Sequence, residues 1–289
     1  MTDKILRATG KVAELRFVLC DLTQSANEIG AKHGLKGQAL GLLGEICVAS
    51  VFQSAGLKHA GAVSTSFEFS GGYATFTAET TPLGLIRAKP SFNNPDTATL
   101  GGDLKKGLIR TKQVDGKGKL LKESIVEMES ISVAKSICSY FLQSEQLKNA
   151  AGIESKVDPE DDSKLLFVGG YYAEALPKIN EATLNMLELN ISQLGSFEKF
   201  HTTEKGLDLN ALLESLMDPM PIEIHREFQA SHYCPCDQKR IMGGLATLEL
   251  KDLNEIAKDP SDLEIHCDFC RSHYVVTSND LKEIIAQKA

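Results

Sequence analysis

Apolar and polar positions alternate over several short stretches in the first two thirds of the chain. This alternation predicts a strand over 12–19 and a hairpin over 66–78, because successive side chains of a strand point to opposite faces. Apolar residues at helical spacing predict helices over 39–55 and 132–143. Further strands are expected at 83–88, 107–112 and 165–168. The pattern therefore predicts a mixed α/β core domain over 1–178.

From residue 179 to residue 230 the pattern changes to leucine stripes at helical spacing. One stripe ends near Gly195 and the other at Asp218. Isolated helices of this length are marginal in water, so their apolar faces must pack on a neighbour. We expect a labile α-helical linker over 179–230, with ordinary connector helices packed on the first domain as the alternative. The stripe positions are Leu184, Leu187, Ile191, Leu194, Leu209, Leu212, Leu213 and Leu216.

The end of the chain, 231–289, is expected to be a small separate domain. Helical spacing covers 238–258, alternation indicates a hairpin over 265–276, and a capped helix is expected over 278–286. About 55 residues bury too little apolar surface to be secure alone. The whole chain is therefore expected to be an α+β protein with an N-terminal core, a helical linker and a small C-terminal domain.

Composition is that of an ordinary globular protein, 42% hydrophobic and 24% charged. The formal net charge is −8, with lysines and arginines scattered, so a nucleic-acid backbone would be repelled and no nucleic-acid partner is expected. The most apolar stretch, 39–52, is too short for a membrane helix and contains Glu45. We therefore expect no membrane association and a cytoplasmic location.

The seven cysteines are unevenly distributed. Cys20, Cys47 and Cys138 are isolated, and Cys47 lies on an apolar helical face, where it fits core packing. In a reducing cytosol a cluster of paired cysteines more often binds metal or does redox chemistry than forms a permanent disulfide. The remaining four form two close pairs separated by 30 residues: Cys234, Cys236, Cys267 and Cys270.

Two such pairs can converge on one tetrahedral ion, and four thiolates at about 2.3 Å suit zinc. We therefore expect these cysteines to bind one Zn²⁺ per chain and to stabilise the small domain. The neighbouring His232, His266 and His273 are alternative ligands. Lys239, Arg240 and Arg271 are placed either to offset the charge of the thiolates or simply to face solvent.

Cys234 and Cys236 are separated by a single residue, and this spacing distinguishes the site from an inert zinc ribbon. A disulfide between them would close a very small ring, and strain of this kind shifts a disulfide toward easy reduction. Thiolates are also the species that oxidants attack. The spacing therefore favours a reversible redox switch over a permanent crosslink.

Several segments resemble the redox-regulated 33 kDa heat-shock chaperone family, also called the 33 kDa chaperonin. The most specific are CPC at 234–236 and CDFC at 267–270. Supporting segments are FLQSEQ at 141–146, VGGYYAEALP at 168–177 and TLNMLELNISQL at 183–194. The resemblance covers nearly the whole chain.

The resemblance implies an ATP-independent holdase chaperone and not an enzyme. It implies that the reduced, zinc-bound form is inactive, and that oxidants form the disulfides Cys234–Cys236 and Cys267–Cys270 and release zinc. It further implies that the linker then unfolds and that the protein, commonly a homodimer when oxidised, binds unfolded or oxidatively damaged clients for transfer to ATP-dependent foldase chaperones. The linker stripes, the core sheet or both are expected to bind clients. A zinc ribbon that binds RNA or the ribosome, and a zinc-dependent enzyme or dithiol oxidoreductase, are the alternatives.

Overall fold

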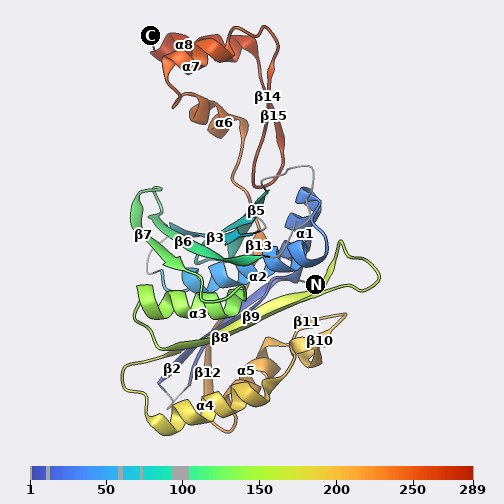
Figure 1. Ribbon diagram of the computed structural model, residues 1–289, viewed down its shortest axis with the longest axis vertical. Coiled ribbons are helices and arrows are strands. Elements are labelled where there is room, and N and C mark those ends of the chain that lie inside the picture. The colour runs from blue at the N-terminus through green and yellow to red at the C-terminus, as the bar shows by residue number, and fades with distance from the viewer. Residues whose placement is uncertain (1, 11–13, 58–60, 72–73, 93–103, 289) are drawn as a thin grey trace. The chain divides into compact units, whose positions relative to one another are not determined.

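The computed structural model describes residues 2–10, 14–57, 61–71, 74–92 and 104–288 (Figure 1). The chain divides into two units, Met1–Tyr233 and Cys234–Ala289. The mixture of sheets and helices confirms the expected α+β class. None of the described helices combines the length and the hydropathy that a membrane span requires.

The first unit contains an antiparallel sheet with strand order β12-β1-β2-β9-β8. The predicted strand at 12–19 is found as β2, with residues 12–13 of the prediction outside the described residues, and the one predicted at 165–168 is the start of a longer strand, β9. β9 continues through Gly169, where a Cβ would collide with the carbonyl of Cys20 on the next strand. A glycine here thus allows two backbones to approach closely instead of ending the strand. The bounds are β1 Lys4–Gly10, β2 Leu15–Asp21, β8 Asn149–Val157, β9 Leu165–Ala175 and β12 Ile222–Gln229.

A second sheet of the first unit has strand order β13-β5-β4-β3-β6-β7. The predicted hairpin is β3–β4, with Phe67 opposite Phe76, and residues 72–73 of its turn lie outside the described residues. The strands predicted at 83–88 and 107–112 are found as β5 and β6. The bounds are β3 Gly61–Ser70, β4 Ala74–Thr80, β5 Leu85–Phe92, β6 Lys105–Asp115, β7 Leu120–Glu127 and β13 Ser231–His232.

Three helices pack with both sheets around the main core: α1 Thr23–His33, α2 Gly37–Ser54 and α3 Val133–Ser144. α2 contacts strands of both sheets, which explains why nearly all of its residues are buried. Cys20 and Cys47 are fully buried in this core, as expected for Cys47. Burial raises the pKa of the Cys47 thiol to about 12, so it stays protonated and unreactive.

The segment 179–230 belongs to the first unit in this structure. Its two expected helices are α4 Glu181–Leu194 and α5 Leu209–Met217, which form a second core with the other face of the β12-β1-β2-β9-β8 sheet. Besides these helices the segment contains a strand that the leucine pattern did not predict, β12, which pairs with β1. The side chains of β12 are mostly exposed and several are charged, so its sequence lacks the alternation of apolar and polar residues that predicts a strand. A short helix Phe197–Phe200 and the strands β10 His201–Thr202 and β11 Gly206–Leu207 connect α4 with α5.

The second unit has a small core of its own, formed by five buried side chains at Leu245, Leu253, Val276, Leu281 and Ile284. The predicted hairpin and final helix are present, and the region predicted helical divides into two helices. Five side chains bury little apolar surface, so the stability of this unit is marginal without a further constraint. The bounds are α6 Gln238–Leu245, α7 Leu250–Ile256, β14 Leu263–His266, β15 His273–Val276 and α8 Ser278–Lys288.

Candidate metal centre

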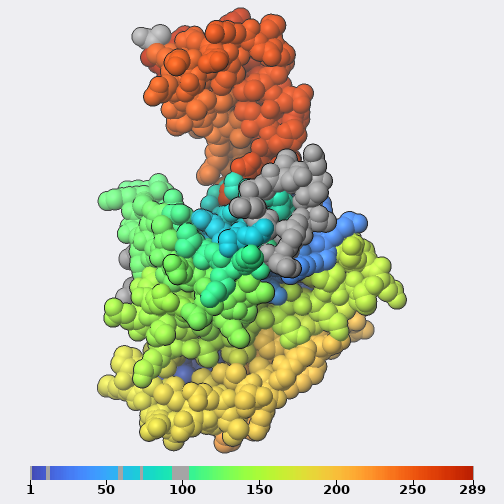
Figure 2. All heavy atoms as spheres, in the orientation of Figure 1, coloured from blue at the N-terminus to red at the C-terminus, as the bar shows by residue number. Residues whose placement is uncertain are grey.

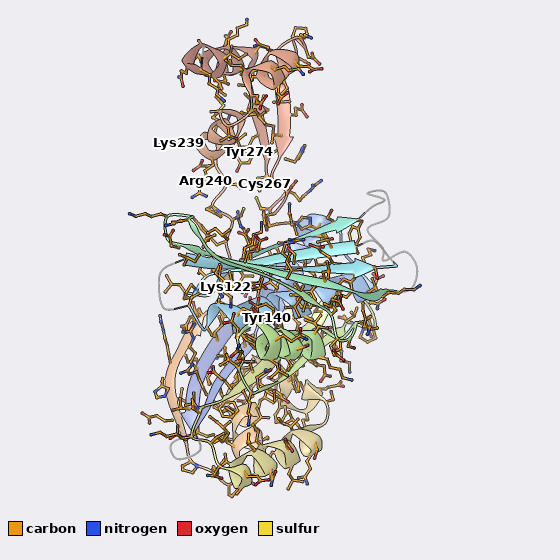
Figure 3. All side chains as sticks on the ribbon, turned by 60° about the vertical axis from the view of Figure 1, so that its left-hand side comes forward. Lys122, Tyr140, Lys239, Arg240, Cys267 and Tyr274 are labelled. Atoms are coloured by element: carbon orange, nitrogen blue, oxygen red, sulfur yellow. The ribbon has the colours of Figure 1, made fainter. Side chains whose placement is uncertain are left out.

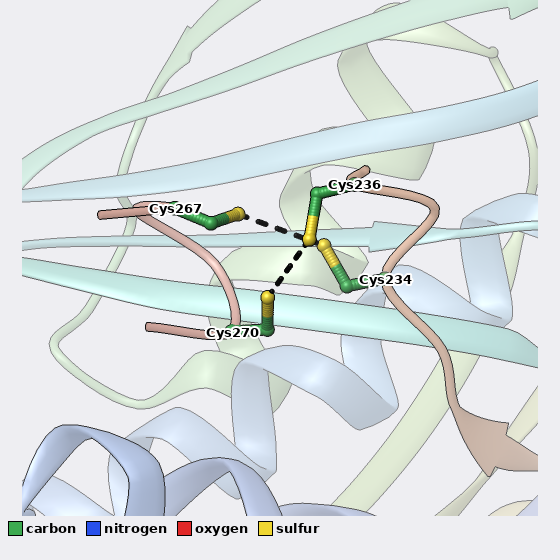
Figure 4. A group of neighbouring side chains, drawn as sticks. All are labelled: Cys234, Cys236, Cys267 and Cys270. Carbon is green, nitrogen blue, oxygen red and sulfur yellow. Dashed lines mark hydrogen bonds between the residues drawn. The ribbon is translucent and has the colours of Figure 1, made fainter. Parts of the chain in front are cut away.

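Four cysteine sulfurs of the second unit converge on one point (Figure 4). All four Sγ atoms lie within 4.8 Å of one another. Cys234 Sγ is 3.8 Å from Cys267 Sγ, and Cys236 Sγ is 3.1 Å from Cys270 Sγ. A tetrahedron of sulfurs with metal–sulfur bonds of about 2.3 Å has S···S distances of about 3.8 Å. The Cys234–Cys267 distance matches this value and the Cys236–Cys270 distance is shorter, so the four sulfurs are close enough to bind a single ion.

Two short backbone loops position the sulfurs. Cys234 and Cys236 precede α6, which begins where the Asp237 side chain accepts a hydrogen bond from the backbone N–H of Arg240 at 2.7 Å. Cys267 and Cys270 lie in the turn of the β14–β15 hairpin. In this turn the Cys267 carbonyl accepts a hydrogen bond from the Arg271 N–H at 2.8 Å. Arg271 has φ +58, a left-handed backbone conformation that is common in tight turns.

Two hydroxyl groups surround the sulfurs. Tyr274 Oη donates a hydrogen bond to Cys236 Sγ at 3.0 Å, and Ser272 Oγ lies 3.2 Å from Cys270 Sγ. Figure 3 shows Tyr274 and Cys267 in this unit. The sequence analysis missed both hydroxyl groups, since strand alternation gives no sign of which hydroxyl reaches a sulfur. Partners of this kind fix the orientation of metal ligands and adjust their basicity.

The electrostatics of the cluster are uneven. Burial opposes ionisation of Cys270, but hydrogen bonds from Ser272 and the neighbouring thiols outweigh it and lower the pKa of Cys270 to about 6. Burial and hydrogen bonding with the neighbouring thiols raise the pKa of Cys236 to about 12. The hydrogen bond to Cys236 and burial raise the pKa of Tyr274 to about 12, so the phenol keeps its proton. Four thiols this close cannot all ionise without a cation, whereas a divalent cation stabilises all four thiolates.

The alternative ligands lie outside this group. His232 Nδ1 is 2.9 Å from Glu28 in the first unit, and the rings of His266 and His273 are 4.9 Å apart. Lys239, Arg240 and Arg271 are exposed, which supports the solvent-facing alternative for them.

No disulfide joins these four cysteines in this structure. The two short contacts each join one cysteine of the first pair to one of the second, which is the arrangement of ligands around a common ion. The pairings expected on oxidation, Cys234–Cys236 and Cys267–Cys270, concern a different state of the protein.

The side chains expected to bind clients are covered in this structure. Six of them are buried in the core between α4, α5 and the sheet, with Leu212 and Leu216 fully buried. Leu184 and Ile191 are half-buried. The outer side of α4 faces solvent (yellow in Figure 2). The six buried positions are Leu187, Leu194, Leu209, Leu212, Leu213 and Leu216.

Comparison with known proteins identifies the family. The model of the family described as Hsp33 protein matches residues 3–277. The chain is 27% identical over 261 residues to the 33 kDa chaperonin of Geobacter sp. (strain M21), covering 87% of this chain and 86% of that protein. It is 25% identical over 262 residues to the 33 kDa chaperonin of Bacillus subtilis (strain 168), covering 86% and 88%.

A solved structure shows the same fold. The crystal structure of the 33 kDa chaperonin (heat shock protein 33 homolog) of Thermotoga maritima matches with a TM-score of 0.83 at 21% identity, covering 100% of this chain and 99% of that chain. The fold, the cysteine cluster and the sequence match lead to one assignment. The chain belongs to the Hsp33 family, whose curated relatives are named 33 kDa chaperonins.

Proposed function

We propose that this protein is a redox-regulated, ATP-independent holdase that is inactive when reduced and zinc-bound. The observation that carries the proposal is the convergence of four reduced thiols within 4.8 Å in a unit with only five buried core side chains. Thiolates are the ligands that zinc prefers in closed structural sites. Zinc held by Cys234, Cys236, Cys267 and Cys270 would supply the stability that this small core lacks.

Oxidation removes the ligands of the metal site. We expect peroxide or hypochlorous acid to form the disulfides Cys234–Cys236 and Cys267–Cys270. For each disulfide formed with peroxide, two thiol sulfurs lose two electrons and two protons, and one peroxide becomes two waters. Disulfide sulfurs are poor zinc ligands, so the ion leaves and the second unit loosens.

The chain itself connects this event to the linker. The metal site begins immediately after Tyr233, whose N–H donates to the carbonyl of Ile86 at 2.9 Å. β13 pairs with β5 through only two residues, and β12 is an edge strand. Loosening of the second unit therefore releases the end of the segment 179–230. Heat then detaches α4 and α5 and exposes their leucines to unfolded or oxidatively damaged clients.

The remaining parts of the proposal concern partners and place of action. The oxidised protein acts as a homodimer in the cytoplasm and passes clients to ATP-dependent foldase chaperones. It turns over no substrate. Exposed apolar side chains bind many partly unfolded chains without a specific sequence, so a holdase of this kind needs no active site.

The test measures metal release and client protection together. Peroxide with mild heat is expected to release about one zinc per chain and to make the protein suppress light scattering from a thermally unfolding client. Cys270→Ser should lower metal content and give protection without oxidant, whereas Cys138→Ser, outside the cluster, should behave as wild type. Equal protection by the reduced, zinc-loaded wild type would exclude the switch.

A further inference from the structure

A cavity of about 460 Å³ lies in the first unit, away from the cysteine cluster. Its floor is the sheet formed by β12, β1, β2 and β9, and its wall is the end of α2 with Phe141 and Leu147. Apolar side chains line most of it, among them Val18 and Phe52. A cavity of this size with an apolar lining and a few polar groups is typical of small-molecule sites.

Positive charge gathers at the β1–β12 side of the cavity. Arg7 and Arg226 lie directly opposite each other on these paired strands, and both line the cavity. Their guanidinium carbons lie 5.5 Å and 4.5 Å from the centre of the Phe228 ring. Like charges directly opposite each other destabilise a strand pair, so an anion between them would be favourable.

A bulge in β12 helps to place polar side chains in the cavity. The register of β1 and β12 shifts between Arg7 and Ala8, because His225 is an extra residue in β12. Such a bulge re-aims side chains, and here both His225 and Arg226 line the cavity. Bulges recur beside binding sites for this reason.

Two polar atoms of the cavity residues lack partners in the part of the chain that the structure describes, although Arg7 Nη2 donates a hydrogen bond to the carbonyl of Pro82 at 3.4 Å. Arg7 Nε and Tyr172 Oη are buried and have no hydrogen-bond partner among the described residues. Tyr172 is 4% exposed and its ring stacks 5.8 Å from Phe52. Arg16 is the one arginine of the lining whose ion pair is seen in the described part of the chain, with Glu174 at 3.2 Å. Buried donors without partners are costly, so their presence in a cavity wall points to a polar ligand group.

We propose that this cavity binds a small amphipathic carboxylate, of the size of a medium-chain fatty acid, with its head between Arg7 and Arg226 and its apolar body against Val18, Phe52 and Phe141. Guanidinium groups bind carboxylates through paired hydrogen bonds, so the two arginines would select a ligand with a carboxylate head. The apolar body gains affinity from burial. Because β12 carries Arg226, the ligand also holds β12 against β1.

Binding is measured by titration calorimetry of the reduced full-length protein with decanoate. We expect one site, and binding at least about tenfold weaker for decyltrimethylammonium, which has the same chain length and the opposite charge. Arg226→Gln should weaken decanoate binding by about tenfold or more, since it removes a charge-assisted contact. Arg110→Gln, on the other sheet of the same unit, is the matched control and should bind as wild type.

A second variant keeps the test independent of the arginines. Ala55→Leu fills the cavity from the end of α2 and should abolish binding with both arginines in place. Decanoate should also slow hydrogen exchange of the β12 amides in the wild type and not in Ala55→Leu. Equal affinity for both amphiphiles, or unchanged binding in Ala55→Leu, would refute the site. Neither measurement uses chaperone activity. A negative result would therefore refute the ligand site without bearing on the proposed chaperone function.

Discussion

Tyr274 Oη donates a hydrogen bond to Cys236 Sγ at 3.0 Å, from the strand that follows the second cysteine pair. A donor that points at a sulfur stabilises its thiolate and reduces its nucleophilicity. Tyr274 is therefore placed to set how readily the proposed switch reacts.

Tyr274→Phe should make the reduced protein release its metal about two to five times faster in peroxide, as expected for loss of a hydrogen bond with a net contribution of about 0.5–1 kcal/mol. It should also weaken metal binding by about tenfold. Metal release followed with a colorimetric chelator measures both effects. Tyr233→Phe changes an exposed tyrosine of the first unit and is the control. Identical release rates in wild type and Tyr274→Phe would show that the hydrogen bond has no such role.

Leu212 lies fully buried on α5, in the core that α4 and α5 form with the sheet. Leu212→Ala removes that packing and should destabilise the α4–α5 region by about 2–5 kcal/mol. If release of these helices exposes the client surface, the variant should protect a client at a lower temperature or lower peroxide dose than wild type. Light scattering of the client measures the threshold.

Leu189→Ala is the matched control, because Leu189 lies on α4 and is 55% exposed. It should leave the thermal threshold unchanged. A Leu212→Ala protein that unfolds earlier and yet needs the same oxidant and heat for protection would separate client binding from these helices.

Asp3 is a buried carboxylate at the start of α1 that accepts hydrogen bonds from the backbone N–H groups of Gln24 and Ser25, each at 2.8 Å. Burial outweighs these hydrogen bonds and raises its pKa from 3.8 to about 6. Between these values the folded protein binds more protons than the unfolded chain, so the contribution of Asp3 to stability falls as pH rises from 3.8 to 6.

As the pH rises from 4 to 7, the unfolding free energy of wild type should therefore fall relative to that of Asp3→Asn, by up to about 3 kcal/mol. Urea denaturation at each pH measures this difference. A wild-type minus Asp3→Asn difference that is constant with pH would contradict the raised pKa.

The sequence was most informative where one strong pattern determined the structure. Two close cysteine pairs predicted a common cluster, and the four sulfurs do converge. Alternation and helical spacing found the β3–β4 hairpin and the α2 and α3 helices. The hairpin strands and α3 each have one apolar face, and α2 is apolar over most of its length. The local sequence of each of these elements is therefore enough to predict it.

Elements that depend on distant partners were missed. β1 and β12 pair with each other across most of the chain, and exposed charged residues such as Arg226 break the alternation of β12. β9 was predicted too short because Gly169 and Gly170 are usually turn residues, whereas here they allow close strand contact. The hydroxyl of Tyr274 was missed because only folding brings it to Cys236.

β12 and β13 each form the outermost strand of a different sheet. Both could therefore peel away without breaking any interior strand, and the central strands of each sheet would stay in place. Their departure would leave β1 and β5 as new borders with rows of unpaired backbone N–H and C=O groups. An extended, partly unfolded polypeptide could add itself to such a border through main-chain hydrogen bonds, whatever its sequence.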